Sequence, residues 1–354
     1  MKLKLIVITL AVSTLVACNL SKKEKVADDG TLAVRTPETE NLLAHLKKVS
    51  SRGFMFGHHD DTNYGIGWEG DEGRSDVKSV CGDYPAVISF DLGHLELGDT
   101  LSLDKVPFSK IRREILNQYK RGGLSSLSWH LRNPLTGGDS WDVSDTTVVK
   151  SILPGGANHE KFAGWVSKVS AFINSLQTED GVKVPVLFRP WHEHTGSWFW
   201  WGEKLCTPEE YKALWHMTVD ILRSDGVDNA LYAYSPGSEP QDTAQYLKRY
   251  PGDDLIDVIG FDTYQFDRPS YLANVGKSLA IVDSIGRTHD KVIAITETGY
   301  EGVPDPKWWT ETLLPAIGLS DSLRPGVAQC PRTCHAFLCP LSRTGVSRRF
   351  RNIL

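Results

Sequence analysis

The chain has 354 residues and a formal net charge of −5, and 40% of its residues are hydrophobic, including eleven tryptophans. This length allows two average domains or one large barrel with a substantial core. No basic stripe occurs before residue 318, and the six cysteines show no metal-type pair spacing, so we expect neither a nucleic-acid partner nor a cysteine metal site.

The first 17 residues have the pattern of a lipoprotein signal peptide. Two lysines precede an apolar stretch, Leu5 to Ala17, that is too short to span a membrane, and small residues lead into Cys18. We expect lipid attachment at Cys18, followed by a flexible tether over residues 18–36. The alternative is an ordinary signal peptide with a chance cysteine. Asn19 is not the aspartate that would favour the inner membrane, so we expect anchoring to the outer membrane of a bacterial envelope, on either its periplasmic or its outer face.

Residues 37–317 alternate short apolar runs with longer amphipathic stretches. Seven strands are predicted, at Gly53–Gly57, Ala86–Asp91, Leu124–Trp129, Val184–Arg189, Leu231–Ser235, Val258–Phe261 and Val292–Thr296. Helices are predicted at Lys105–Arg121, Glu160–Leu176, Pro208–Arg223, Ser270–Ile285 and Lys307–Ala316. One continuous series of this kind predicts an α/β protein with a single (β/α)8 TIM barrel. An open doubly wound sheet is the alternative, but no glycine-rich phosphate loop follows a strand.

Polar residues follow nearly every predicted strand. They are His58, His59 and Asp60; Asp91 and His94; His130, Arg132 and Asn133; Arg189 and His192 to His194; Asp262 and Tyr264; and Glu297. In a barrel these strand ends meet on one rim, where barrel enzymes keep their active sites.

Two of these residues suit the cleavage of a glycosidic bond. That reaction needs a proton donor and a carboxylate on opposite sides of the reacting sugar. Glu193 and Glu297 follow the fourth and seventh predicted strands, which face each other across an eight-stranded barrel. If the enzyme retains configuration, Glu193 would be the acid and base, Glu297 the nucleophile, and their carboxyl groups would lie about 5–5.5 Å apart.

Aromatic residues surround the first of these glutamates. Trp191, Trp198, Trp200 and Trp201 fall within eleven residues of a predicted loop, and such rings pack well on the C–H faces of sugars. We expect at least one of the four to be buried, and we expect that the loop cannot bury all of them together.

These motifs together resemble glycoside hydrolase family 26, the β-mannanases. Arg189–Gly202 is similar to the acid/base motif of that family, and Ile295–Gly299 to its nucleophile strand. Weaker matches occur in the same order at Phe56–His59, Asp91–His94, Ser128–His130 and Gly260–Tyr264, so the resemblance runs from about residue 40 to residue 316.

The resemblance implies a retaining endo-β-1,4-mannanase acting on mannan, glucomannan or galactomannan, without metal or organic cofactor. By matching position, Glu193 would be the acid/base and Glu297 the nucleophile. His130, His192 and Tyr264 would hold the sugar at the cleavage point or orient the nucleophile, and Trp198 would stack on the sugar. Arg189 and Asp262 would support these groups. We expect a monomer whose partners are β-mannan polysaccharide or manno-oligosaccharides.

The pattern breaks after residue 317. Family members complete the barrel with an eighth strand ending in a Trp-Arg pair, which is not recognisable in this sequence. Residues 318–354 instead contain six arginines, no lysine and one acidic residue, so they carry +5 while the preceding 317 residues carry −10. A divergent final strand, an added basic segment and a reading-frame error all remain open, and we favour the last.

Other functions use the same residues differently. A metal-dependent hydrolase would employ His58, His59, His192 and His194, and a non-catalytic lipoprotein would capture glycans with its tryptophans. An endo-β-glucanase would use the same two glutamates. Endo or exo action would depend on the loops at residues 65–74 and 137–144.

Overall fold

A closed barrel of eight parallel strands forms the centre of the computed structural model, which describes residues 35–50, 53–318 and 327–328. The strands are β1 (Met55–His59), β4 (Val87–Asp91), β5 (Leu124–Ser128), β6 (Val186–Arg189), β7 (Ala230–Tyr234), β8 (Val258–Tyr264), β9 (Val292–Gly299) and β10 (Val327–Ala328). Each pairs in parallel with its neighbours, and β1 pairs with both β4 and β10. The predicted (β/α)8 fold is confirmed, and all seven predicted strands lie at barrel strands.

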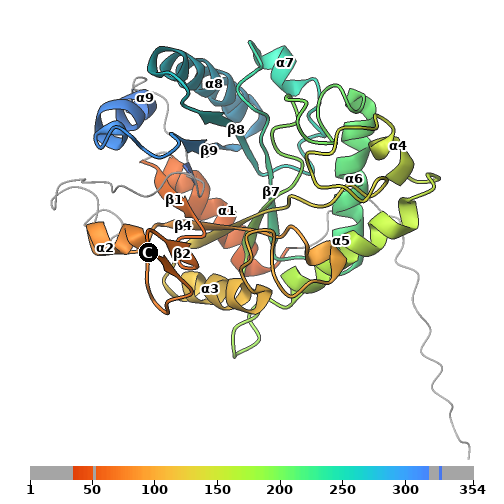
Figure 1. Cartoon of the computed structure of the whole chain (residues 1–354), viewed down its shortest axis with the longest axis horizontal. Helices are drawn as coiled ribbons and strands as arrows, with labels where there is room; N and C mark the ends of the chain where they lie inside the picture. The colour runs from red at the N-terminus through yellow and green to blue at the C-terminus, as the bar shows by residue number, and fades with distance from the viewer. Residues whose placement is uncertain (1–34, 51–52, 319–326, 329–354) are drawn as a thin grey trace, which may run out of the picture. The chain divides into compact units, whose positions relative to one another are not determined.

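Helices surround the strands (Figure 1). They are α1 (Pro37–Ser50), α2 (Asp76–Cys81), α3 (Phe108–Lys120), α4 (Val148–Ile152), α5 (His159–Asn174), α6 (Pro208–Ser224), α7 (Thr243–Leu247), α8 (Arg268–His289) and α9 (Leu314–Gly318), the last preceded by a π-helical turn at Trp308–Leu313. The five predicted helices correspond to α3, α5, α6, α8 and the turn with α9. None of the helices in the described ranges has the length and apolar character needed to cross a membrane.

The two ends of the barrel interior differ in polarity. At the amino ends of the strands, Val87, Leu124 and Leu187 form an apolar cluster with Leu46 and Val49 of α1. Side chains at even spacing along a strand point to the same face, so the residues two or four positions after this apolar cluster also point into the barrel. They are Asp91 (after Val87), Ser128 (after Leu124) and Arg189 (after Leu187). Helix α1 therefore packs at the apolar end, and the polar end presents the charged side chains.

The eighth strand lies where none was predicted. Val327 and Ala328 pair with β9 on one side and β1 on the other, and this two-residue strand closes the barrel. A closed barrel leaves no unpaired sheet edge. Other residues after position 318, the signal peptide, Cys18 and most of the tether lie outside the described residues.

Candidate active site

A buried arginine ties three strands together at the polar end of the barrel. Nη1 of Arg189 donates to Oδ2 of Asp262 at 2.8 Å and to Oγ of Ser235 at 3.1 Å. Its Nη2 donates to Oε2 of Glu297 at 2.5 Å. Because only 2% of the Arg189 side chain is exposed, its charge interacts with both carboxylates at low local dielectric. Arg189 thus contacts Glu297 directly, and Asp262 shares the same cation.

A β-bulge sets the direction of the two carboxylates. Phe261 pairs with Ile295, but the next residue of β8, Asp262, pairs with Glu297. Thr296 is therefore an extra residue on β9, and its hydroxyl donates to Oδ1 of Asp262 at 2.6 Å. Bulges beside active sites commonly redirect a side chain, and this one places Glu297 beside Asp262 on the polar rim.

Glu193 reaches the same place from a strained loop after β6. Glu193 and Trp191 have φ angles of 52° and 56°, which side-chain-bearing residues adopt only when their surroundings hold them. The backbone N–H of Glu193 donates to the carbonyl of Ser235 at 2.8 Å, and the indole of Trp198 donates to Oε2 of Glu193 at 2.7 Å. One oxygen each from Glu193, Asp262 and Glu297 lie within 4.8 Å of one another.

The two glutamates differ in their protonation. Burial, followed by the charges of Glu297 and Asp262, raises the pKa of Glu193 well above its ordinary value. Burial also raises the pKa of Glu297, but the charge of Arg189 and the hydrogen bond from Tyr264 outweigh it, so that this pKa lies below its ordinary value. A carboxyl group with a raised pKa thus faces one with a lowered pKa, the arrangement in which one group can give a proton while the other attacks.

Tyr264 completes the surroundings of Glu297. Its phenolic hydroxyl donates to Oε1 of Glu297, the oxygen that Arg189 leaves free. Burial, followed by the charges of Glu297 and Glu193, raises the pKa of Tyr264 well above 10, so the hydroxyl keeps the proton that it donates. Tyr264 therefore orients Glu297 directly.

Two histidines lie beside the carboxylates. Nε2 of His192 is 2.9 Å from Nε2 of His130, and Nδ1 of His130 lies 2.6 Å from Oδ2 of Asp91. His192 is buried, whereas 19% of the His130 side chain is exposed. Both predicted histidines belong to the site. Asp91 was singled out as a strand-end residue, but its contact with His130 was not predicted.

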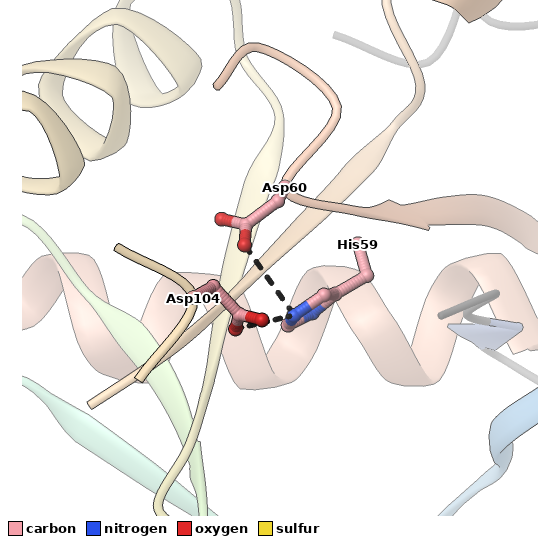
Figure 2. Close-up of side chains that lie close together, drawn as sticks. All are labelled: His59, Asp60 and Asp104. Carbon is pink, nitrogen blue, oxygen red and sulfur yellow. Dashed lines mark ion pairs between the residues drawn. The ribbon is translucent and has the colours of Figure 1, made fainter. Parts of the chain in front are cut away.

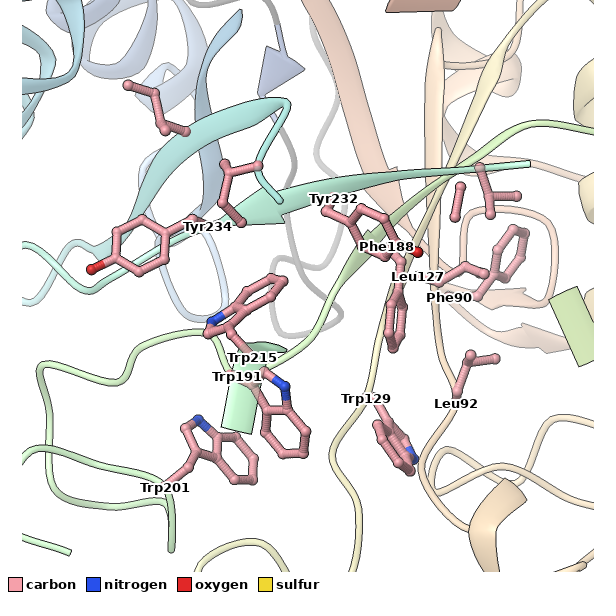
Figure 3. Close-up of a cluster of buried hydrophobic side chains, with 14 of the residues drawn as sticks. Phe90, Leu92, Leu127, Trp129, Phe188, Trp191, Trp201, Trp215, Tyr232 and Tyr234 are labelled. Atoms are coloured by element: carbon pink, nitrogen blue, oxygen red, sulfur yellow. The ribbon is translucent and has the colours of Figure 1, made fainter. Parts of the chain in front are cut away.

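At least one of the four tryptophans was expected to be buried but not all of them together, and both expectations are confirmed. Trp191, Trp200 and Trp201 are fully buried, and only Trp198, 42% exposed, faces solvent. Trp191 packs on Trp129, Trp200 and Trp201, and Figure 3 shows Trp191 between Trp129 and Trp201. The loop folds back over this cluster, so its aromatic content stabilises the strained backbone at Glu193, and of these four tryptophans Trp198 alone is available to a sugar.

A buried cation holds the rest of that loop. The Arg249 guanidinium donates to the backbone carbonyls of residues 194, 201, 202, 203 and 206, and it lies over the ring of Tyr211. Arg249 is 3% exposed, and no carboxylate pairs with it among the described residues. Arg249 follows α7, far along the chain from the loop that it contacts, so no local sequence pattern indicates this role.

A second exposed tryptophan joins the site from the loop after β5. Trp141 is 48% exposed and stacks on His130, with ring centroids 5.5 Å apart and an interplanar angle of 7°. It was not predicted, although an aromatic residue within the glycine- and aspartate-rich loop after a barrel strand could have indicated it. The loop at residues 137–144 thus borders the site, as expected.

The residues after β1 form a separate cluster. Nε2 of His59 lies 3.5 Å from Oδ2 of Asp60 and 3.8 Å from Oδ2 of Asp104 (Figure 2). Burial lowers the pKa of His59, but Asp60 and Asp104 overcome this and raise it to about 9. His59 is thus an imidazolium paired with carboxylates at neutral pH.

The four histidines of the metal-hydrolase alternative are not grouped together. His58 pairs with Asp61, His192 with His130, and His194 stacks on Tyr211 and Tyr234. Potential ligand groups in the described ranges are His59, Asp60 and Asp104, and the three active-site carboxylates. The remaining predicted rim residues, His94, Arg132 and Asn133, contact neighbouring loop atoms: His94 lies near Asp99, Arg132 donates to Gly137, and Asn133 donates to Asp142.

Comparisons with known proteins agree with this geometry. A family model described as "Glycosyl hydrolase family 26" matches residues 33–306. A mannan endo-1,4-beta-mannosidase of Bifidobacterium adolescentis is 36% identical over 279 residues, which are 75% of this chain and 27% of that protein. One from Bacillus subtilis is 27% identical over 282 residues, 75% of this chain and 72% of the relative. The chain thus spans about a quarter of the first relative's length.

A solved structure is similar over most of the chain. The structure of a GH26 beta-mannanase from Bacteroides ovatus superposes with a TM-score of 0.83 at 58% identity, and the match covers 85% of this chain and 87% of that one. An endo-beta-1,4-mannanase from Cellulomonas fimi matches with a TM-score of 0.79 at 31% identity, covering 91% and 75% of the two chains.

Proposed function

Because the chain belongs to glycosyl hydrolase family 26 and is a glycoside hydrolase, we propose that it cleaves internal β-1,4-mannosidic bonds of mannan, glucomannan or galactomannan with retention of configuration. Glu193 is the acid and base in this proposal, and Glu297 is the nucleophile. The similar proteins from Bifidobacterium, Bacillus and Bacteroides are all described as mannanases or mannosidases, which supports mannan as the substrate.

The spacing of the carboxylates carries the proposal. Enzymes that retain configuration keep their two carboxyl groups about 5–5.5 Å apart, and those that invert it about 6.5–9.5 Å apart, to leave room for water. Oxygens of Glu193 and Glu297 within 4.8 Å of each other favour the first class. The raised pKa of Glu193 and the lowered pKa of Glu297 agree with the same assignment.

Each step has a group in place. An oxygen of Glu297 bonds to the anomeric carbon while Glu193 protonates the departing glycosidic oxygen, so the first product leaves and a glycosyl ester remains. Glu193 then removes a proton from water, which attacks the same carbon and releases Glu297. Arg189 and Tyr264 hold Glu297 ionised and oriented for its attack in the first step, since each donates to a different oxygen of its carboxylate.

The sugar at the cleavage point is held by the neighbouring side chains. His192 directly precedes Glu193 and contacts His130, and the half-exposed ring of Trp198 presents a flat apolar surface while its indole N–H remains bonded to the acid. Sugars pack their C–H faces on such rings, so Trp198 positions the ring and hydrogen-bonds Glu193 at the same time.

Product analysis tests the proposal. The purified protein is incubated separately with β-mannan, β-1,4-glucan and mixed-linkage glucan, alongside the Glu193→Ala and Glu297→Ala variants. Short manno-oligosaccharides from mannan alone, absent with both variants, are expected. Release of mannose or mannobiose only would contradict internal cleavage, cleavage of glucan would contradict the substrate, and undiminished activity of either variant would contradict the assigned roles.

We further propose that the protein is a monomer anchored to a bacterial envelope membrane, in the outer membrane, through lipid on Cys18. The small residues before Cys18 and the apolar stretch that precedes them support the anchor. Cys18→Ser should release the protein from the membrane fraction of expressing cells. Continued sedimentation of the variant with membranes would contradict lipid attachment.

A further inference from the structure

Asp91 accepts four hydrogen bonds. It is the first member of a series of side-chain contacts that continues through His130 to His192. Its Oδ1 accepts from the backbone N–H groups of Gly93 and His130, at 2.6 and 3.2 Å. Its Oδ2 accepts from the hydroxyl of Ser128 at 2.7 Å and lies 2.6 Å from Nδ1 of His130. A carboxyl group whose two oxygens both face donors is held as the carboxylate, so Nδ1 of His130 carries a hydrogen.

Burial and the charge of Arg189 lower the pKa of His192 well below its ordinary value, and with His192 neutral the next contact allows two arrangements of protons. Nε2 of His130 and Nε2 of His192 are 2.9 Å apart, a distance that requires one of them, and only one, to carry a hydrogen. In the first arrangement His130 is an imidazolium and donates to a neutral His192, whose own hydrogen is on Nδ1. In the second, His130 is neutral and accepts from His192, whose Nδ1 is then a bare acceptor.

We propose that Asp91 is a positioning residue that holds His130 as the imidazolium and thereby fixes Nδ1 of His192 as a hydrogen-bond donor to the substrate. Nδ1 of His192 is buried and has no partner within the described part of the chain. The inference rests on the proposed function, because a hydroxyl oxygen of the sugar beside Glu193 is the acceptor that this N–H would meet.

The charges around His130 favour this arrangement. Asp91 on β4 and Glu297 on β9 stabilise the imidazolium, Arg189 on β6 opposes it, and His192 after β6 is its hydrogen-bond acceptor. Burial lowers the pKa of His130, but Asp91 overcomes this and the pKa is raised. Burial, Arg189 and His130 all lower the pKa of His192, so the second proton stays on His130. Removing the charge of Asp91 should reverse the hydrogen bond between the two Nε2 atoms, so that His192 donates and a neutral His130 accepts.

Nitrogen-15 NMR of the full chain with labelled histidine reads the arrangement directly. The His130 signals are assigned with His130→Gln, and spectra are recorded from pH 5 to 9. We expect both nitrogens of His130 to be protonated at pH 7 in the wild type, and only one in Asp91→Asn. Asp61→Asn is the matched control, because Asp61 pairs with Nδ1 of His58 at 2.9 Å, is also buried, and should leave the His130 signals unchanged.

The kinetic expectation follows from the reversed hydrogen bond. We expect kcat/KM on mannan to fall about tenfold or more for Asp91→Asn, a loss of the size expected for one hydrogen bond to a charged group, with the alkaline limb moved to lower pH. Asp91→Glu keeps the charge and should keep both His130 nitrogens protonated, which preserves the test if the asparagine variant does not fold.

The NMR measurement tests the protonation of His130 independently of any catalytic activity. A wild-type His130 with one protonated nitrogen at pH 7, or an Asp91→Asn variant that keeps two, would overturn the inference whatever the protein hydrolyses. If the histidine signals behave as expected but mannan is not cleaved, the proposed function fails and the assignment of Asp91 to His130 stands.

Discussion

Replacing Arg189 with methionine should destabilise the protein strongly. Methionine has a similar length but no charge, so Arg189→Met leaves Asp262 and Glu297 buried without their cation, which is 2% exposed. Removing one partner of a buried ion pair costs about 3–5 kcal/mol. At roughly 2 °C per kcal/mol for a domain of this size, the Tm should fall by roughly 6–10 °C in scanning calorimetry.

The pH dependence of this loss follows from Glu297. Its pKa in the folded wild type is below its ordinary value of 4.5, so its contribution to stability is present above the unfolded pKa and is lost as pH falls through the folded one. Without Arg189 that pKa rises. The difference in Tm between wild type and variant should therefore be largest at neutral pH and should shrink on acidification.

Arg189→Lys provides the matched control. It keeps the charge but replaces Nη1 and Nη2, which bond Asp262 and Glu297 separately, with a single Nζ, so its Tm should lie between those of the wild type and the methionine variant. A methionine variant within about 2 °C of the wild type at pH 7, or a difference that grows as pH falls, would refute the assigned role of the ion pair.

Three further changes test other parts of the structure. Tyr264→Phe removes a hydrogen bond to a charged carboxylate, worth about 1.5–3 kcal/mol, so kcat/KM should fall about tenfold or more. The acid limb of its pH profile should move to higher pH, and an unchanged limb would contradict the hydrogen bond from Tyr264 to Glu297. Arg249→Met leaves buried carbonyls unpaired and should lower the free energy of unfolding in urea by about 2–4 kcal/mol. The exposed Arg287→Met should lower it by less than about 0.5 kcal/mol, and equal losses would contradict the role of Arg249 in holding the loop. Trp200→Ala should cost about 3–5 kcal/mol of stability, whereas Trp198→Ala should chiefly impair activity, and the reverse pattern would contradict their burial.

The positions of the strands could be predicted from local sequence. Most barrel strands from β1 to β9 are short apolar runs ended by polar residues, although β5 contains three serines, and the barrel brings those ends together whatever the loops do. That is why Glu193, Glu297 and the surrounding Arg189, His130 and Tyr264 were identified before their contacts were known.

The remaining features depend on contacts between distant parts of the chain. The burial of Trp191 and Trp201 follows from how one loop folds over Trp129, and loop composition alone does not determine this. Asp91 meets His130 because β4 and β5 pair in a register that sets Asp91 opposite Ser128. Strand β10 is only two residues long, too short to leave an apolar run in the sequence.

The stereochemistry of the first product tests the central claim most directly. Proton NMR during hydrolysis of a manno-oligosaccharide by the purified protein distinguishes the newly formed anomers before mutarotation. Our account predicts that the β-anomer appears first, because Glu193 and Glu297 are close enough for a covalent glycosyl intermediate on Glu297. Initial formation of the α-anomer would show inversion by directly attacking water and would contradict Glu297 as the nucleophile.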